Sequence, residues 1–137
     1  MKKWIVPGFL VLLTGCSGAP VKDVPATAPS TGKLVELKAD NYSFAPARLS
    51  VPADTPVVIR IHDASKLIPH SFVLEGPGGK VIVRQELAKS GDTMVRLAPL
   101  PAGSYVFYCD KSFLGSSHRA KGMEGKLEVT PATVPPR

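Results

Sequence analysis

The fold is indicated most clearly by one hexapeptide, Val57-Val58-Ile59-Arg60-Ile61-His62. Its side chains alternate, so that Val57, Ile59 and Ile61 share one face of an extended chain, while Arg60 and His62 lie on the other. A period of two is typical of a β-strand with one buried face and one solvated face. The hexapeptide therefore predicts a sheet, with His62 as an ordinary exposed strand residue.

Similar apolar runs recur along the chain, separated by turn residues such as Gly76-Pro77-Gly78-Gly79. These runs are residues 34–38, 42–44, 48–51, 57–62, 71–75, 81–83, 93–97, 103–108 and 125–129. We expect about eight strands in an antiparallel Greek-key β-sandwich or barrel. Met94 is expected to pack within a strand, and one short helical turn is expected at 86–89. The 14 prolines and 12 glycines among 137 residues fit this all-β class better than a helical bundle.

The N-terminus has the pattern of an export signal. Lys2 and Lys3 precede an apolar run over residues 4–13, which is shorter than the ~20 residues of a membrane-spanning helix. Cys16 follows Leu-Thr-Gly, a sequence similar to the bacterial lipobox, in which the cysteine is acylated and becomes the new N-terminus. The alternative is an ordinary cleaved signal followed by a chance cysteine. We expect a signal peptide over residues 1–15 and a lipid on Cys16.

The remaining chain divides into three segments. Residues 16–32 are rich in Pro, Ala, Ser and Thr and predict a tether, because they hold too little apolar area to offset the entropy of ordering. Residues 33–130 contain the predicted strands and form the expected domain. Residues 131–137 form a Pro-rich tail.

Residues suited to binding a metal gather at two places. Cys109 ends one predicted strand, and His118 and Met123 follow it after eight and four intervening residues. That loop can present a thiolate, an imidazole and a thioether to one point, and His70, at the start of a distant strand, can add a second imidazole. Taken singly, a buried cysteine or a core methionine is common. Together, two nitrogens, one thiolate and a weak thioether suit copper in a trigonal site with a long axial bond.

In these residues the sequence resembles the cupredoxins, the blue copper family, from about residue 33 to 130. The resemblance is carried by Pro69-His70-Ser71-Phe72, by Tyr105-Val106-Phe107-Tyr108-Cys109, by the spacing to His118 and Met123, and by Gly122-Met123-Glu124-Gly125. It implies one copper ion that cycles between Cu(I) and Cu(II). His70, Cys109 and His118 would be its equatorial ligands and Met123 its axial ligand. Ser71 stands where many members have Asn, and its backbone N–H is expected near the Cys109 sulfur.

The ligand loop also bears on whether the protein is an enzyme. Its spacing is similar to that of the electron-transfer site in copper nitrite reductases, but Tyr108 stands where those enzymes have a histidine that binds the catalytic copper. The dinuclear domain of cytochrome oxidase subunit II needs two cysteines on this loop, and only Cys109 is present here. The resemblance therefore implies a mononuclear carrier of single electrons, not an enzyme.

The resemblance also implies a docking surface. In the family the electron usually passes through the exposed edge of the loop histidine, here His118. The residues expected to form an apolar patch around it are Phe113, Leu114, Gly115 and Met123, ringed by Lys111, Arg119 and Lys121. We expect a redox partner such as a cytochrome or a copper enzyme to bring an acidic face, and association to weaken as salt rises.

Two other functions stay open at this point. The first is copper storage or delivery without electron transfer, although delivery proteins typically expose Met-rich or His-rich clusters that this chain lacks. The second is a metal-free adhesion or assembly sandwich, which leaves the Cys–His–Met spacing unexplained. Removal of residues 1–15 takes away two lysines and lowers the formal charge from +6 to +4, which is too modest to indicate nucleic-acid binding. We expect a monomer, lipid-anchored to a bacterial membrane, with its domain in the periplasm or at the cell surface.

Overall fold

The structure is a computed structural model that describes residues 32–133. The predicted signal peptide, Cys16, nearly all of the tether and the end of the tail lie outside these residues. Within the described range, no helix is long and apolar enough to cross a membrane.

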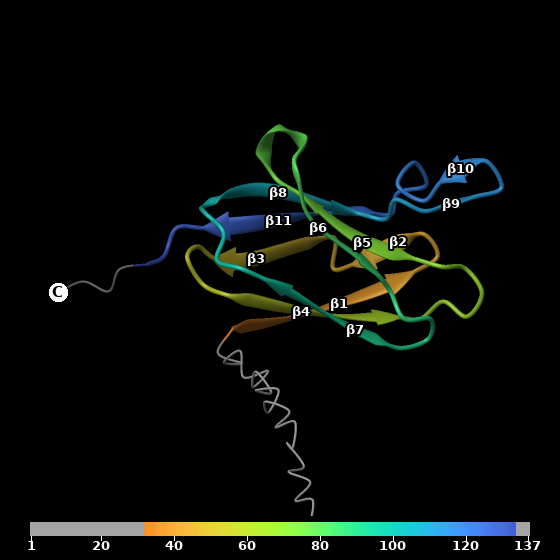
Figure 1. Cartoon of the computed structure of the whole chain (residues 1–137), viewed down its shortest axis with the longest axis horizontal. Helices are drawn as coiled ribbons and strands as arrows, with labels where there is room; N and C mark the ends of the chain where they lie inside the picture. The colour runs from red at the N-terminus through yellow and green to blue at the C-terminus, as the bar shows by residue number, and fades with distance from the viewer. Residues whose placement is uncertain (1–31, 134–137) are drawn as a thin grey trace, which may run out of the picture.

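The described chain is almost entirely strand (Figure 1). Its elements are β1 (Lys33–Asp40), β2 (Ser43–Ala45), β3 (Arg48–Pro52), β4 (Val57–Asp63), β5 (Ser71–Glu75), the 3-10 turn η1 (Pro77–Gly79), β6 (Val81–Glu86), β7 (Asp92–Leu97), β8 (Gly103–Tyr108), β9 (Ser112–Phe113), β10 (Ser116–Ser117) and β11 (Glu124–Thr130). The all-β prediction is confirmed. The helical turn expected at 86–89 is wrong, because Glu86 pairs with Ser71 and extends β6 instead.

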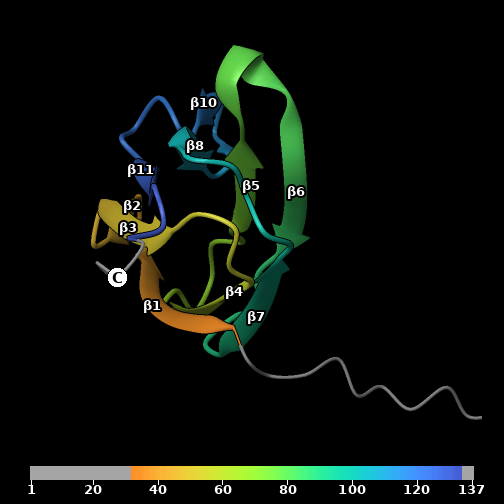
Figure 2. The same cartoon turned by 90° about the vertical axis from the view of Figure 1, so that its left-hand side faces the viewer.

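Two sheets face each other as a sandwich (Figure 2). One has the strand order β2-β1-β4-β7, the other β3-β11-β8-β5-β6, and β9 pairs with β10 as a separate hairpin. Most neighbouring strands are antiparallel, as expected, but β1 pairs with β4 and β3 with β11 in parallel. The pair β1–β4 is parallel because β3 lies in the second sheet. The chain crosses to that sheet after β2 and returns to the first sheet at β4, which runs in the same direction as β1.

The core lies between the two sheets and follows the predicted alternation. Val57, Ile59 and Ile61 of β4 are buried, while Arg60 and His62 are exposed. Each such apolar side chain contributes roughly 1.5–3 kcal/mol when fully buried. The prediction that Met94 packs inside is wrong. Met94 is 42% exposed, because the inward positions of β7 are taken by Val95 and Leu97.

Three phenylalanines close the core beneath one end of the sandwich. Phe44, Phe72 and Phe107 have ring centroids 5.5 to 6.2 Å apart. The start of β5, the end of β8, the β1–β2 turn and the β9–β10 hairpin all lie at this end, on the right in Figure 1. Because Phe72 and Phe107 are each two residues from a predicted ligand, His70 and Cys109 respectively, this packed floor holds those segments in place.

Candidate metal centre

The predicted ligands come from strand ends that the sheet brings together. His70 directly precedes β5, Cys109 directly follows β8, and His118 directly follows the β9–β10 hairpin. Because β5 and β8 pair antiparallel, the start of one lies beside the end of the other. His70, Cys109 and His118 are 0–1% exposed and offer ligand atoms that all lie within 4.8 Å of one another.

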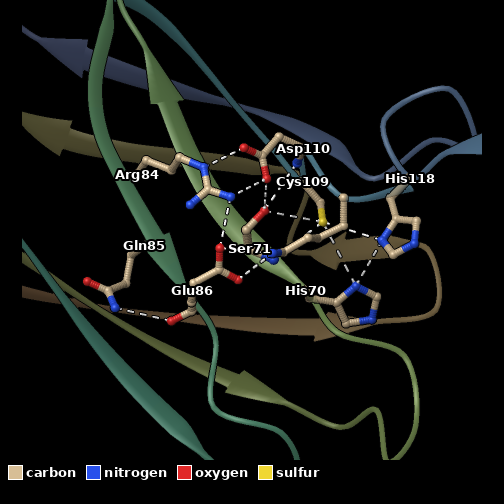
Figure 3. A network of polar contacts seen from close by, with 9 residues as sticks. His70, Ser71, Arg84, Gln85, Glu86, Cys109, Asp110 and His118 are labelled. Atoms are coloured by element: carbon tan, nitrogen blue, oxygen red, sulfur yellow. Dashed lines mark hydrogen bonds and ion pairs between the residues drawn. The ribbon is translucent and has the colours of Figure 1, made fainter. Parts of the chain in front are cut away.

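The three donor atoms form a compact triangle (Figure 3). Nδ1 of His70 lies 3.3 Å from Nδ1 of His118, and Sγ of Cys109 lies 3.4 Å from the His118 nitrogen and 4.0 Å from the His70 nitrogen. Bonds of about 2.0–2.3 Å, typical of imidazole and thiolate ligands, place trigonal donors about 3.5–3.8 Å apart. The triangle therefore fits one transition-metal ion near its centre.

Met123 is tied by its backbone to the same three-residue set. Its carbonyl accepts from the Cys109 N–H at 3.1 Å, and its N–H donates to the His118 carbonyl at 3.0 Å. The whole residue is buried. Its assignment as an axial ligand stays a prediction that this backbone position favours.

The Cys109 sulfur accepts a hydrogen bond from the Ser71 backbone N–H at 3.4 Å, as the sequence predicts. The Ser71 hydroxyl lies 3.5 Å from the same sulfur but only 2.5 Å from Oδ1 of Asp110. Arg84 holds Asp110 through two hydrogen bonds of 2.5 and 3.1 Å (Figure 3). Asp110 and Arg84 are thus a second layer of the site that the sequence analysis missed. They come from different strands, and no local pattern signals their pairing.

The β1–β2 turn supports the site from the other sheet. Oδ1 of Asn41 lies 3.3 Å from Nε2 of His70, so Nε2 donates there and Nδ1 is left as an acceptor that faces the donor triangle. Burial lowers the pKa of His70, against the opposing pull of Asp63 and Asp40. The imidazole is therefore neutral at pH 7, which is the form that binds a metal.

His118 differs from expectation because its ring has no exposed edge. It is 0% exposed, and its Nε2 is buried with no hydrogen-bond partner among the described residues. The ring of Tyr42 covers it, with centroids 4.8 Å apart and planes at 64°. Burial lowers the pKa of His118, and repulsion from His70 when that ring is protonated, and from Lys121 and Lys111, adds to the shift.

The predicted apolar patch is present only in part. Leu114 is 88% exposed and Phe113 43% exposed, and Gly115 lies beside them at the hairpin tip, but Met123 is buried beneath the ligand loop and cannot contribute. Leu67, which the sequence analysis missed, is 85% exposed on the segment between β4 and β5. An isolated leucine in a loop carries no signal of its exposure.

The predicted ring of positive charge is partly neutralised. Lys111 pairs with Glu86 at 2.7 Å, and Arg119 pairs with Glu124 and lies 3.9 Å from Glu75. These acids lie on β6, β11 and β5 of the same sheet, and their side chains reach residues of the ligand loop. Among the ion pairs of the described residues none involves Lys121, whose Nζ lies 4.1 Å above the Tyr42 ring instead.

A β-sandwich that buries one cysteine sulfur and two imidazoles at one end belongs to the class of small proteins that hold one metal ion in a rigid β frame. The described donor set fits a mononuclear copper ion, because thiolate and imidazole donors in a trigonal array suit copper in both of its common oxidation states. A sequence model described as the Cupredoxin-like domain matches residues 9–128. The chain therefore belongs to the cupredoxin family.

Solved structures agree with this assignment of the fold. A reduced auracyanin from Roseiflexus castenholzii superposes with a TM-score of 0.60 at 19% identity, over 74% of this chain and 99% of that one. Auracyanin A from Chloroflexus aurantiacus, described as a blue copper protein, gives 0.57 at 21% identity, over 71% and 98%. Reduced rusticyanin gives 0.54 at 24% identity, over 72% and 81%. No curated protein matches the chain by sequence.

Proposed function

We propose that this protein carries single electrons between redox partners through one type 1 copper ion. The observation that carries the proposal is the burial of all three donor residues on strand ends that are fixed by the sheet. Bound copper would supply one-electron redox chemistry there. Because the donor residues are 0–1% exposed, the site suits outer-sphere electron exchange.

The surroundings of the donors favour this role over copper delivery. Asn41 orients His70, and the Ser71 N–H holds the Cys109 sulfur, so the donors are fixed before a metal arrives. Preorganised donors rearrange little when an electron is gained or lost. A delivery protein needs donors that a receiving protein can reach, and these are 0–1% exposed.

The proposal is tested by adding Cu(II) to the purified protein and recording its visible spectrum and a redox titration. We expect an intense thiolate charge-transfer band and reversible one-electron reduction. Cys109→Ala should lose the band, whereas His62→Ala, which alters an exposed histidine on the same fold, should keep it. A colourless protein whose copper passes readily to a chelator would support storage or delivery instead.

We further propose that a redox partner docks on the hairpin end of the domain. Leu114, Phe113 and Leu67 are the exposed apolar side chains on segments at that end, and Lys121 adds a cation that no described acid pairs with. An acidic partner face would fit this surface, and its association should weaken with salt. A cytochrome or copper enzyme whose stopped-flow rate is insensitive to ionic strength would contradict the electrostatic part.

The N-terminal sequence supports attachment of this domain to a bacterial membrane through Cys16. The tether would then hold the domain near membrane-bound redox partners and raise the encounter frequency. Mass spectrometry of the mature N-terminus tests this: we expect acylated Cys16 in the natural chain and no lipid in Cys16→Ser.

A further inference from the structure

The His118 ring is buried on the side that faces away from the donor triangle, although the residue itself lies on the ligand loop at the surface of the domain. Its Nδ1 faces the Cys109 sulfur at 3.4 Å, while its Nε2 is buried and has no partner among the described residues. A buried N–H without an acceptor costs free energy. The group that covers this edge is therefore a specific feature of the site rather than loose packing.

Tyr42 packs against the His118 ring. Its ring meets the His118 ring in an edge-to-face arrangement, with centroids 4.8 Å apart, which is a favourable contact for aromatic groups. Tyr42 packs against the core cluster yet keeps part of its surface exposed. Its turn lies at the same end of the sandwich as the ligand loop (Figure 1). Tyr42 thus reaches from a buried imidazole to solvent.

A cation lies over this ring. Nζ of Lys121 is 4.1 Å from the Tyr42 centroid, close enough for a cation–π interaction. Two residues earlier on the same loop, Arg119 covers Tyr108 in the same way at 3.9 Å. Tyr108 directly precedes Cys109. Two partly buried tyrosines therefore lie next to ligands of the site, Tyr42 against the His118 ring and Tyr108 beside Cys109.

We propose that Tyr42, rather than an edge of His118, is the surface through which this site exchanges electrons, and that it also excludes water from the imidazole. This rests on the proposed electron-transfer function. One electron leaves the reduced site and converts an outer-sphere acceptor, such as the Fe(III) of ferricyanide, to Fe(II). No bond forms or breaks, no proton moves, and Tyr42 is neither oxidised nor deprotonated, because it serves only as the contact across which the electron tunnels.

The choice of Tyr42 over Tyr108 follows from their surroundings. Arg119, which covers Tyr108, is also held by Glu124 and Glu75, so that face presents a neutralised cluster to a partner. Lys121 has no acidic partner among the described residues, so its positive charge is not neutralised by an ion pair beside Tyr42. Tyr42 also contacts a ligand ring directly, whereas Tyr108 is joined to a ligand only through the backbone.

The first test measures how far Tyr42 protects His118 from a chemical reagent in the metal-free protein. Diethyl pyrocarbonate acylates accessible histidines, and peptide mass spectrometry locates the modification. We expect His62 to react in every variant as an internal standard, and His118 to be protected in the natural chain and in Tyr42→Phe but modified in Tyr42→Ala. Equal modification of His118 in the natural chain and in Tyr42→Ala would overturn the sealing role.

The second test measures oxidation of the copper-loaded protein by ferricyanide and by a cationic cobalt complex in stopped flow. We expect Tyr42→Phe to keep the natural rate with both reagents, and Tyr42→Leu to slow both. Tyr108→Leu tests the competing route beside Cys109, and it should slow oxidation by either reagent less than Tyr42→Leu does. Slowing by Tyr108→Leu but not by Tyr42→Leu would overturn the proposal. Absence of oxidation by either reagent in the natural chain would instead contradict the electron-transfer function itself.

Discussion

The Ser71 hydroxyl donates its proton to Asp110 and not to the Cys109 sulfur. The oxygen-to-oxygen distance is 2.5 Å, whereas the same hydroxyl lies 3.5 Å from the sulfur. A hydroxyl has one proton to donate. The backbone N–H of Ser71 is therefore the hydrogen-bond donor that this residue gives to the sulfur, and Asp110 determines that outcome.

Removing the Asp110 acceptor should raise the reduction potential of the copper-loaded protein. In Asp110→Ala the Ser71 hydroxyl is free to turn to the sulfur, and a hydrogen bond there withdraws electron density from the thiolate and favours the reduced metal. The lost negative charge acts in the same direction. A redox titration measures the change. The double variant Ser71→Ala/Asp110→Ala should show a smaller rise in the reduction potential, since only the loss of charge remains. Equal potentials for the single and the double variant would contradict a hydrogen bond from the Ser71 hydroxyl to the sulfur.

Removing Arg84 should weaken the fold above pH 4 and much less below it. Burial raises the pKa of Asp110, but hydrogen bonds from Arg84 and Ser71 outweigh it and hold the pKa below the ordinary 3.8. A lowered carboxyl pKa contributes stability that is complete above the unfolded value and is lost as the pH falls through the folded one.

Because Arg84 is partly exposed and solvent screens its ion pairs, Arg84→Gln should lower the free energy of unfolding only modestly at pH 7. Urea unfolding at pH 7 and pH 3 tests this, with the difference from the natural protein shrinking at pH 3. Arg60→Gln, which breaks a surface pair with Glu36 far from the site, is the control for a general charge effect. A loss of equal size at both pH values would contradict the role of Asp110.

The metal-free protein should lose stability as the pH falls below about 6.5. Burial lowers the pKa of both His70 and His118, so the folded protein keeps these rings neutral at a pH where the unfolded chain protonates them. The unfolded state then binds more protons, and the free energy of unfolding rises with pH across this range. Urea titrations of metal-free protein from pH 8 to 5 measure the slope. His70→Leu should flatten it, and an unchanged slope would contradict the assignment.

Cys109 and His118 could be predicted as one group because their order and spacing are local, whereas His70 lies on a distant strand and was assigned through the family resemblance. A strand that ends in Cys109 and a loop that carries His118 and Met123 are visible without any tertiary contact. The alternation in β4 likewise identified its buried face, since a period of two follows from the geometry of an extended backbone.

The surroundings of the donors could not be predicted because they depend on contacts between distant segments. Tyr42 precedes His118 by 76 positions, and the hydrogen bond from Ser71 to Asp110 spans 39. The exposed edge expected for His118 was wrong for this reason, because nothing near that residue in the sequence shows that a turn from the other sheet lies on it. The charge of Lys111 was overestimated in the same way, because Glu86 reaches it from β6.

Gly125 should tolerate no side chain. A Cβ there would lie 2.3 Å from Cζ of Phe107 and 2.7 Å from the Ala47 carbonyl oxygen, so the ring beneath the site would have to move. Gly125→Ala should cost on the order of 1–3 kcal/mol, the usual range for overpacking. Thermal unfolding measures the loss. Gly103→Ala is the control, since its Cβ would meet Tyr105 at an ordinary 3.7 Å, and equal losses in the two variants would contradict the steric explanation.

Leu114 adopts a backbone conformation that its own side chain disfavours. It has φ 50° and Gly115 has φ 78°, and the flanking Phe113 and Ser116 pair, so the two form a type I′ hairpin turn. Asn-Gly is the preferred sequence for that turn, because a bulky residue is strained at positive φ. Leu114 is also 88% exposed, so burial of its side chain does not offset the free-energy cost of the strained backbone. Strain kept at an exposed apolar residue points to a role in binding.

Leu114→Asn should therefore raise the stability of the fold and slow electron exchange with a protein partner. Relief of the left-handed strain is on the order of 1 kcal/mol, visible as a higher midpoint of thermal unfolding. The stopped-flow rate with a cytochrome that carries an acidic face should fall, because the apolar contact is lost, whereas the rate with a small inorganic reductant should not change. A gain in stability with an unaltered cytochrome rate would show that the hairpin tip takes no part in docking, and a loss of stability would contradict the strain itself.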